Sequence, residues 1–369
     1  MNLYGNLQVF FALLRASLWE TEARLLPYDN IDFSDVLRLA QEQSVVGLVA
    51  AGLEHVIDVQ VPKEVKLTFV GYIMQIEQQN LAMNKFVSEL FKRLQQKNIK
   101  AVLVKGQGVA QCYEQPLWRA SGDVDLLLDD ENYEMAKALL APIAVSVEQE
   151  YVTFKHLGMV MPNGIEVELH GTLHTRLSSR IDRYLDAIQE GAFKNNQIRV
   201  WNNNGVEVPL PGPNDDVIFL FTHILHHFYV EGIGMRQICD WCRFLWTYKE
   251  EIDSALLETR LKEMGLISEW KAFAALAVNW LGIPMYAMPL FNENENQNEY
   301  PWKKKGDRIM ALVLKSGNFG HNRASTNGKM HSAWRKMNDF GRRAKLFPMD
   351  SPKFFCHFVK DGLQLAISK

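Results

Sequence analysis

The sequence predicts an α+β protein in which a mixed β-sheet is flanked by helical regions on both sides. Apolar residues recur at helical spacing through the first part of the chain, and the pattern returns in the last part. Between them, short apolar runs alternate with turn residues, which is typical of strands. We therefore expect an N-terminal helical region over 1–97, a mixed-sheet core over 98–210 and a C-terminal helical region over 211–369.

Composition excludes several classes of protein. A net charge of -3 over 369 residues gives no overall electrostatic attraction for nucleic acid, and four scattered cysteines do not form a disulfide framework. No apolar run approaches the roughly 20 residues that span a bilayer. The apolar stretch Leu7–Leu14 lacks the flanks of a signal peptide. We expect a soluble, cytoplasmic protein.

The N-terminal region is expected to form three helices that carry no chemistry. Apolar residues between Val9 and Leu18 predict the first. A second would start with Ser34 as its N-cap and run towards Leu53. After the break at Pro62, a long amphipathic pattern predicts a helix that ends near Lys97.

The core begins with a buried strand over 101–104. Lys105, Gly106 and Gly108 interrupt the apolar run and can lead into a helix, which Pro116 would stop. A second apolar run then ends at Leu128.

Two carboxylates in that second run are the principal chemical signal. Asp123 and Asp125 are two residues apart, so in a strand both side chains lie on one face. Two adjacent negative charges in an apolar strand are unfavourable unless a cation offsets them. Carboxylate oxygens suit Mg²⁺ or Mn²⁺, which makes this pair a candidate metal site.

A second polar strand face follows downstream. Acids at 129–131 fit the first turn of a helix that continues from Tyr133 to Leu140. Strands are predicted over 151–154, 158–161 and 165–170, with a hairpin turn at 162–164. In the last of these, Glu166, Glu168 and His170 share one face. The two acids could serve a metal site or simply face solvent.

The C-terminal region is expected to be mostly helical after a hairpin over 198–210. The helix that follows holds His223, His226 and His227, but no third-ligand pattern favours a zinc site, and contact with nucleotide or acceptor is preferred. Arg236 could contact a phosphate or pair with Asp240, and the pair is slightly preferred. The motif of Cys239 and Cys242 predicts buried helical thiols.

The chain turns basic over 329–345. This basic segment could grip an anionic partner, nucleic acid or a membrane surface, but the spacing of its apolar residues favours a helix with a solvated basic face.

These patterns together carry a resemblance to a known family. Lys105-Gly106, Tyr113, Arg119 and the run Ser121-Gly122-Asp123-Val124-Asp125-Leu126-Leu127 resemble an uncharacterised bacterial nucleotidyltransferase family of the polymerase-beta-type nucleotidyltransferase superfamily. The resemblance covers residues 98–175 well. It departs from the superfamily at Gln107, where a serine or glycine is usual, so no hydroxyl contact to phosphate is expected there.

The resemblance implies a nucleotidyltransferase-type sheet core and a reaction. A nucleoside monophosphate would pass from a nucleoside triphosphate to an unknown acceptor, with a small molecule favoured and nucleic acid not favoured. Asp123, Asp125 and Glu168 would be catalytic and hold Mg²⁺ or Mn²⁺, and the acid two residues before a histidine favours Glu168 over Glu166. Nucleotide contacts are expected from the following residues: Lys105, Gly106, Gln107, Arg119 and His170.

Two alternatives remain. The chain could be a non-catalytic nucleotide-binding module, against which the intact pair of aspartates argues. It could also be a nucleotidyltransferase directed at nucleic acid through the basic segment, against which the near-neutral net charge argues.

Overall fold

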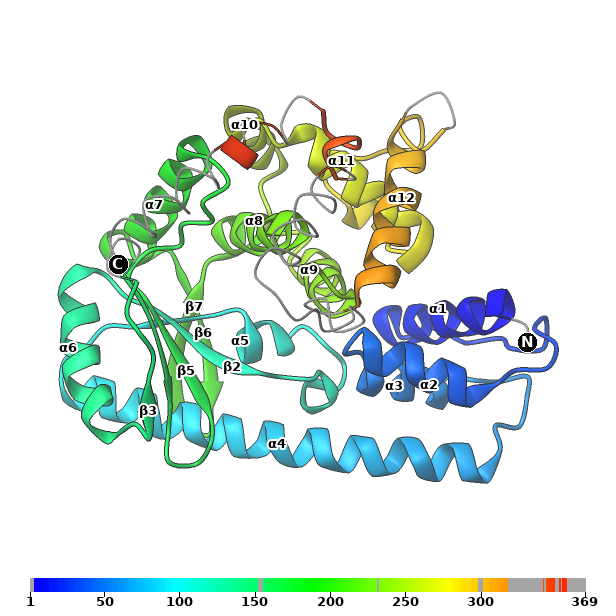
Figure 1. Ribbon diagram of the computed structural model, residues 1–369, viewed down its shortest axis with the longest axis horizontal. Helices are drawn as coiled ribbons and strands as arrows, with labels where there is room; N and C mark the ends of the chain where they lie inside the picture. Colours follow the sequence, from blue (N-terminus) through cyan, green and yellow to red (C-terminus); the bar gives the residue numbers. More distant parts are fainter. Residues whose placement is uncertain are drawn as a thin grey trace.

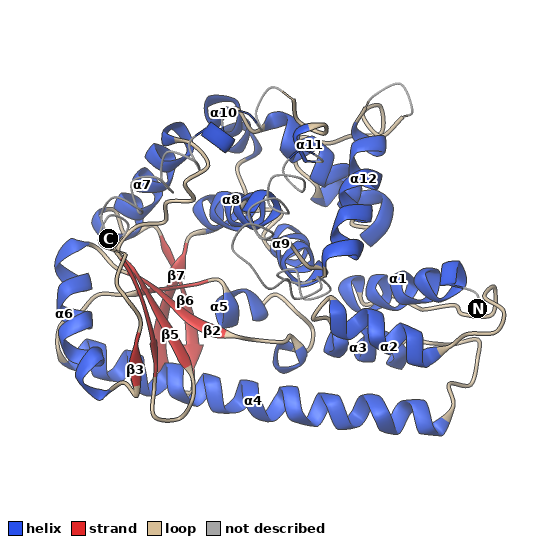
Figure 2. Ribbon diagram, in the orientation of Figure 1, coloured by secondary structure: helices blue, strands red, loops and turns tan. Residues whose placement is uncertain are grey.

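The computed structural model describes residues 3–151, 155–230, 232–297, 301–317, 341, 343–348, 352 and 354–356. Helices surround a small sheet, with the long helix α4 along one edge of the molecule (Figures 1 and 2). The helices are α1 Leu3–Trp19, α2 Phe33–Glu42, α3 Val46–Glu54, α4 Lys63–Gln96, α5 Gly106–Ala110, α6 Asp130–Leu140, α7 Ser179–Lys194, α8 Pro213–Val230, α9 Met235–Thr247, α10 Ser254–Met264, α11 Ile267–Leu276 and α12 Trp302–Ser316.

The central sheet has five strands in the order β1-β2-β5-β4-β3. Its strands are β1 Val102–Val104, β2 Asp123–Leu127, β3 Ser146–Val147, β4 His156–Val160 and β5 Glu166–His170. β2 and β5 are parallel, whereas the other neighbours are antiparallel. The predicted α+β class with a mixed sheet is confirmed.

The two faces of this sheet differ in chemistry because strand residues alternate between faces. One face is apolar and packs against α4 and α6 in a single hydrophobic cluster; its strand members include Leu103, Val124, Leu126, Leu157, Met159, Val167 and Leu169. The opposite face carries the acids and histidines. The strands therefore anchor the sheet through one side and present polar groups on the other.

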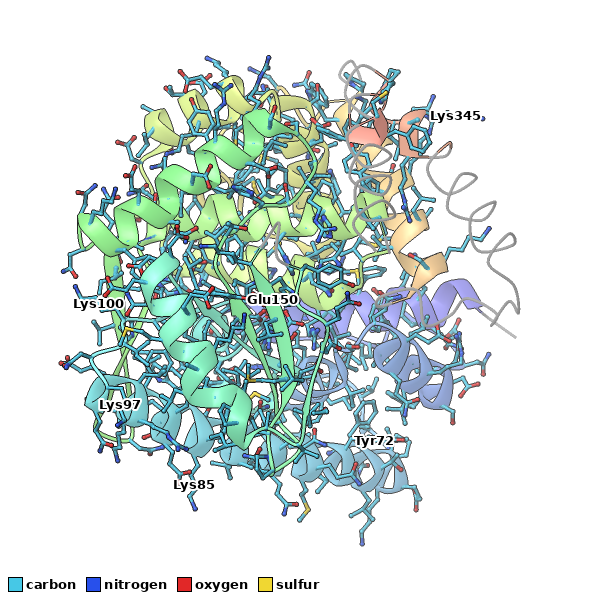
Figure 3. The ribbon with its side chains drawn as sticks, turned by 60° about the vertical axis from the view of Figure 1, so that its left-hand side comes forward. Tyr72, Lys85, Lys97, Lys100, Glu150 and Lys345 are labelled. Atoms are coloured by element: carbon cyan, nitrogen blue, oxygen red, sulfur yellow. The ribbon has the colours of Figure 1, made fainter. Side chains whose placement is uncertain are left out.

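Long helix α4 supports the apolar face along its C-terminal half. Met83, Val87, Leu90 and Leu94 recur at helical spacing and join the cluster beneath the sheet. On the outer side of the same helix, Lys85 points away from the molecule (Figure 3), with 79% of its side chain exposed. The predicted helix ending near residue 97 is confirmed.

The N-terminal prediction of one helix from Ser34 to Leu53 is wrong. The chain forms α2 and α3 with a break over residues 43–45, where Ser44 adopts a positive φ of 56°. Moreover, the N-cap of α2 is Asp32, whose carboxylate accepts from the backbone N–H of Ser34 and Asp35. An aspartate two residues earlier serves the same capping chemistry as the predicted serine.

Three further segments can be compared with expectation. The hairpin β6 Ile198–Asn203 and β7 Val206–Pro211 confirms the predicted turn, and α6 starts three residues earlier than its apolar pattern, at Asp130. The predicted strand over 151–154 falls mostly outside the described residues, and Tyr151 makes only an isolated bridge to His156.

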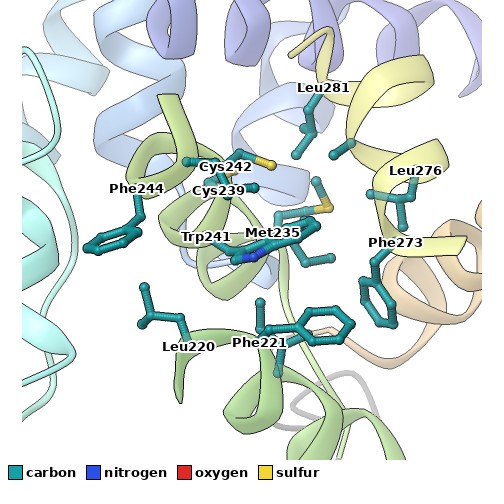
Figure 4. Packing of buried hydrophobic residues seen from close by; sticks show 14 of the residues in the cluster. Leu220, Phe221, Met235, Cys239, Trp241, Cys242, Phe244, Phe273, Leu276 and Leu281 are labelled. Atoms are coloured by element: carbon teal, nitrogen blue, oxygen red, sulfur yellow. The ribbon is translucent and has the colours of Figure 1, made fainter. Parts of the chain in front are cut away.

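The C-terminal helices share a second core with the N-terminal helices. Within it, Phe221 packs against Trp241 and Phe273 (Figure 4) and against Trp270. Cys239 and Cys242 are fully buried on α9 within this cluster, as predicted. The division of the chain at 97 and 210 stays a prediction, because this core joins residues from the first and last regions.

Most of the basic segment over 329–345 lies outside the described residues. Of its described basic residues, Lys345 is exposed as expected, whereas Arg343 departs from the expected solvated face because it is 5% exposed. Its guanidinium donates to the Tyr229 carbonyl at 2.6 Å and lies over the Phe228 ring. The last carbonyls of a helix lack intrahelical partners, so a cation at the end of α8 satisfies one of them.

In the described part of the chain, no helix is both long enough and apolar enough to cross a bilayer.

Candidate functional site

Three carboxylates converge on the polar face of the sheet. In the parallel pair of β2 and β5, Asp125 lies directly beside Glu168, and Asp123 precedes Asp125 on the same face. Carboxylate oxygens from all three lie within 4.8 Å of one another. Asp125 is 2% exposed, whereas Asp123 and Glu168 are half-buried at the rim. The sequence placed the two aspartates together, and the register of β5 adds the third acid.

Mutual repulsion defines the electrostatics of this group. Asp125 first, and then burial, raises the pKa of Asp123 above its usual range, while Lys105 opposes the rise. Carboxylates held together in a site of low polarity favour a proton or a cation between them. The geometry and the donor set therefore fit a hard divalent cation such as Mg²⁺, which prefers oxygen ligands.

Lys105 supplies positive charge at the centre of the group. Its Nζ lies 2.7 Å from Asp125 Oδ1, and its side chain is 16% exposed. Burial opposes the ammonium, but Asp125, Asp123 and Glu168 raise its pKa above the usual value. The backbone at Lys105 has a φ of 58°, a left-handed conformation that is strained for a residue with a Cβ. The end of β1 is thus bent sharply at the residue that reaches the carboxylates.

His170 continues the network from the end of β5. Its Nε2 lies 2.8 Å from Asp125 Oδ1 and 3.2 Å from Glu168 Oε2. Burial works against the imidazolium, but the bonds to Asp125 and Glu168 raise the pKa of His170. His170, which was expected to contact the nucleotide, therefore contacts two of the three carboxylates directly.

His156 on β4 is a member of the site that sequence reasoning missed. Its Nε2 lies 3.2 Å from Glu168 Oε2, and its ring is 4.8 Å from that of His170. Burial would raise the pKa of Glu168, but bonds from His156 and His170 hold it below its usual range. The signal was present in the predicted hairpin: counting back from a turn centred on Asn163 pairs residue 156 with residue 170.

Glu166 shares the polar face but stands outside the carboxylate group. It pairs with Asp123 in the strand register, yet it is exposed at the beginning of β5. Burial, followed by the charges of Glu168 and Asp123, raises its pKa. The placement favours Glu168 as the third acid.

The glycine turn after β1 forms the short helix α5. Gly106 has a φ of 40°, and the backbone N–H groups of Gly108 and Val109 donate to the Lys105 carbonyl. The Gln107 side chain is 2% exposed and donates to Asn80 Oδ1 on α4 at 2.8 Å. Position 107 is therefore tied to the supporting helix through its side chain, and only its backbone faces the turn.

Arg119 takes a different place from the one expected. It is 5% exposed and holds Asp240 of α9 with two hydrogen bonds, from Nε at 3.0 Å and from Nη2 at 2.6 Å. The Tyr113 hydroxyl donates to the same carboxylate at 2.8 Å. Two residues that carried the family resemblance thus join the segment between α5 and β2 to α9, which favours a structural role for Arg119.

Arg236 lies closer to the carboxylates than its expected pairing with Asp240 implied. Its Nη1 donates to the Ala120 carbonyl, just before β2, at 3.1 Å. Its charge also lowers the pKa of Asp123, although repulsion by Asp125 and burial outweigh it. Asp240 is bound by Arg119 through two hydrogen bonds, which the sequence did not predict.

The three α8 histidines make different contacts. Burial and then the charge of Lys105 lower the pKa of His223 well below its usual value, which places its ring within electrostatic reach of the site. His227 Nε2 lies 3.1 Å from His223 Nε2, and His226 Nδ1 lies 2.7 Å from the Thr175 carbonyl. Within the described residues, the three-ligand groups are formed by the sheet and not by α8.

Comparisons with known proteins complete the description. Residues 29–282 match a protein family described as uncharacterised nucleotidyltransferase. The crystal structure of an antigenic nucleotidyltransferase-like protein from Paracoccidioides brasiliensis is 18% identical, with a TM-score of 0.32, over 50% of this chain and 87% of that chain. No curated protein matches the chain.

Proposed function

Because this chain belongs to the family of uncharacterised nucleotidyltransferases, we propose that it moves a nucleoside monophosphate from a nucleoside triphosphate to an acceptor, with release of pyrophosphate. The observation that carries the proposal is the convergence of Asp123, Asp125 and Glu168 on one sheet face. Mg²⁺ or Mn²⁺ held there would polarise phosphate oxygens and ease deprotonation of the acceptor.

The residues around the carboxylates have complementary tasks. Asp123 and Asp125 on β2 would hold the cation, and Glu168 would fix its position from β5. Lys105 and Arg236 neutralise charge on the triphosphate, because both lie close enough to act on Asp123. Within the turn, the first backbone N–H groups that bond to the Lys105 carbonyl are those of Gly108 and Val109. The N–H groups of Gly106 and Gln107 come before them in the chain, so we assign these two to phosphate oxygens.

His170 and Glu168 organise the remaining charge. His170 keeps Asp125 in place through the contact of Nε2 with Oδ1 at 2.8 Å, and the bonds to Asp125 and Glu168 raise the pKa of His170 against the effect of burial. Glu168 stays ionised because two histidines bond it. An ionised acid beside the cation suits a residue that positions the acceptor for attack. We propose a small-molecule acceptor, which is consistent with the near-neutral net charge of the chain.

The test combines binding with chemistry. Thermal shifts are measured with each nucleoside triphosphate with and without Mg²⁺, and pyrophosphate release is then measured with candidate acceptors. Asp123→Asn together with Asp125→Asn should abolish metal-dependent binding and turnover while circular dichroism stays unchanged. Binding without pyrophosphate release under any condition would favour the non-catalytic nucleotide-binding module, and unchanged metal-dependent binding in the double variant would overturn the assignment of the aspartates.

A further inference from the structure

A second group of ligand atoms adjoins the three carboxylates. His156, Glu168 and His170 each offer one atom, and these atoms lie within 4.8 Å of one another. Both imidazoles present Nε2 to the same oxygen, Glu168 Oε2, at 3.2 Å. The group therefore has two nitrogens and one oxygen, whereas the carboxylate group has oxygens alone.

The strand register builds this group. His156 on β4 is the antiparallel partner of His170 on β5, and Gly158 is the partner of Glu168. Cross-strand partners point to the same face, so both rings stand beside the carboxylate. Gly158 has no side chain, and Glu148 fills the space next to it, with Oε2 2.8 Å from the position that a Cβ would take. The three donors are thus fixed by backbone pairing on two adjacent strands rather than by a loop.

The two distances from the histidine nitrogens to Glu168 Oε2 match the edges of a metal polyhedron. Bonds of about 2.0–2.1 Å from a tetrahedral ion to nitrogen and oxygen place neighbouring ligand atoms about 3.3 Å apart. The two contacts of 3.2 Å have that length. They are also slightly longer than the usual charge-assisted hydrogen bond of about 2.7–2.9 Å. By contrast, His170 Nε2 and Asp125 Oδ1 are 2.8 Å apart, which is a hydrogen-bond length.

We propose that His156, Glu168 and His170 form a binding site for a transition-metal ion of the Zn²⁺ class. This site prefers a different metal ion from the one that the oxygen-only group prefers. Imidazole nitrogen suits Zn²⁺ and its neighbours in the first transition series, whereas Mg²⁺ prefers oxygen. The metal takes the place of protons on the two Nε2 atoms, and these protons pass to solvent. Glu168 is shared between the groups, and its Oε2 is the oxygen that both histidines contact.

The site does not depend on the proposed transfer reaction, since the metal is predicted to bind without nucleotide. It shares Glu168 with that proposal, so variants must separate the two groups. His156 belongs to the histidine group only, and Asp123 belongs to the carboxylate group only. His55 provides a matched control, because its Nε2 also contacts a glutamate, Glu114, at 3.5 Å in another part of the molecule.

The experiment uses the full chain after removal of metals with a chelator, titrated with Co²⁺ alone. Visible absorption reports the coordination of Co²⁺, and X-ray absorption of the Zn²⁺ complex counts imidazole ligands. We expect one equivalent to bind with two histidines and to resist excess Mg²⁺. His156→Gln should weaken Co²⁺ binding by about 100-fold or more, the upper range for losing support of a bound metal. Asp123→Asn and His55→Gln should change it by less than about threefold.

Several outcomes would overturn the site: no stoichiometric Co²⁺ binding by the unaltered chain, equal binding by His156→Gln, or equal loss in Asp123→Asn. Zn²⁺ spectra without imidazole ligands would do the same, and this measurement needs no variant to fold. Failure of the proposed transfer reaction would look different. In that case metal-dependent nucleotide binding would be missing while the Co²⁺ signal of the unaltered chain remained.

Discussion

The two faces of the central sheet use the same five strands for opposite purposes. On one face, Val124 and Leu126 are fully buried against α4 and α6. On the other, Asp123 and Asp125 alternate with them and meet Lys105 and the acids of β5. Hydrophobic burial stabilises the sheet, whereas clustered carboxylates oppose folding unless cations offset them. The apolar face must therefore supply the stability that the polar face lacks.

The largest effect on stability is expected on the apolar face. Leu126→Ala removes a fully buried side chain between the two aspartates' strand and the supporting helices, so the free energy of unfolding should fall by about 2–5 kcal/mol. Urea denaturation measures this loss. The exposed Leu26→Ala is the control, with a change within about 0.5 kcal/mol. Equal losses in both variants would show that the apolar face does not carry the stability of the sheet.

The largest effect on activity alone is expected on the polar face. Glu168→Gln should lower kcat/KM by about 10² or more, the scale for a positioned acid or base. Glu166→Gln, at an exposed position on the same strand, should change it much less. Pyrophosphate release measures both, with melting curves to confirm folding. The reverse order would move the third acid two residues along β5.

A smaller effect should distinguish the arginines beside the site. Arg236→Gln should weaken binding of the nucleoside triphosphate by about tenfold, equivalent to about 1.4 kcal/mol, because one charge on the phosphates is lost. Isothermal titration measures the affinity. Arg260→Gln is the control, since its ion pair with Asp215 joins α10 to α8 away from the carboxylates. If Arg236→Gln leaves the affinity unchanged, a cation other than Arg236 must contact the phosphates.

The smallest effect should appear as a pH dependence of stability without metal. The pKa of Asp123 is raised by Asp125 and burial above its usual value of 3.8. The stability linked to its proton is fully present below that usual value and is lost as pH rises through the folded-state pKa. Metal-free Asp123→Asn should therefore gain in Tm relative to the unaltered chain as pH rises. Thermal melts in a chelator between about pH 4 and 8 would show it, and parallel pH profiles would contradict it.

The candidate site shows how far local patterns extend. Alternation along a strand predicted that Asp123 and Asp125 share a face, and the same rule grouped Glu168 with His170. Which strands lie side by side is a different matter, because sequence period does not determine the partner of a strand. The parallel pairing of β2 with β5 is what brings Glu168 beside Asp125. Counting back from the predicted hairpin turn would have paired His156 with His170, but only the tertiary structure shows that His156 contacts Glu168.

Charged residues outside the strands were harder to place. Arg119 and Arg236 are both basic residues near the motif, and the i, i+4 spacing favoured Arg236 as the partner of Asp240. The packing of α9 against the glycine turn decides it, since Arg119 and Tyr113 both reach that carboxylate in a buried position. Likewise, Arg343 belongs to a basic run that predicted a solvated face. Its guanidinium is instead buried, where it donates a hydrogen bond to a carbonyl at the end of α8.

The sequence by itself determined the α+β class, the long helix α4, the hairpins and the two strand faces that hold the acids. These features follow from periodicity and turn chemistry, which act over a few neighbouring residues. Only the tertiary structure decided the order of the strands, the histidine group around Glu168 and the partners of the buried arginines. Those choices depend on which distant segments pack together, and a buried charge takes its role from the one partner that packing brings within hydrogen-bonding distance.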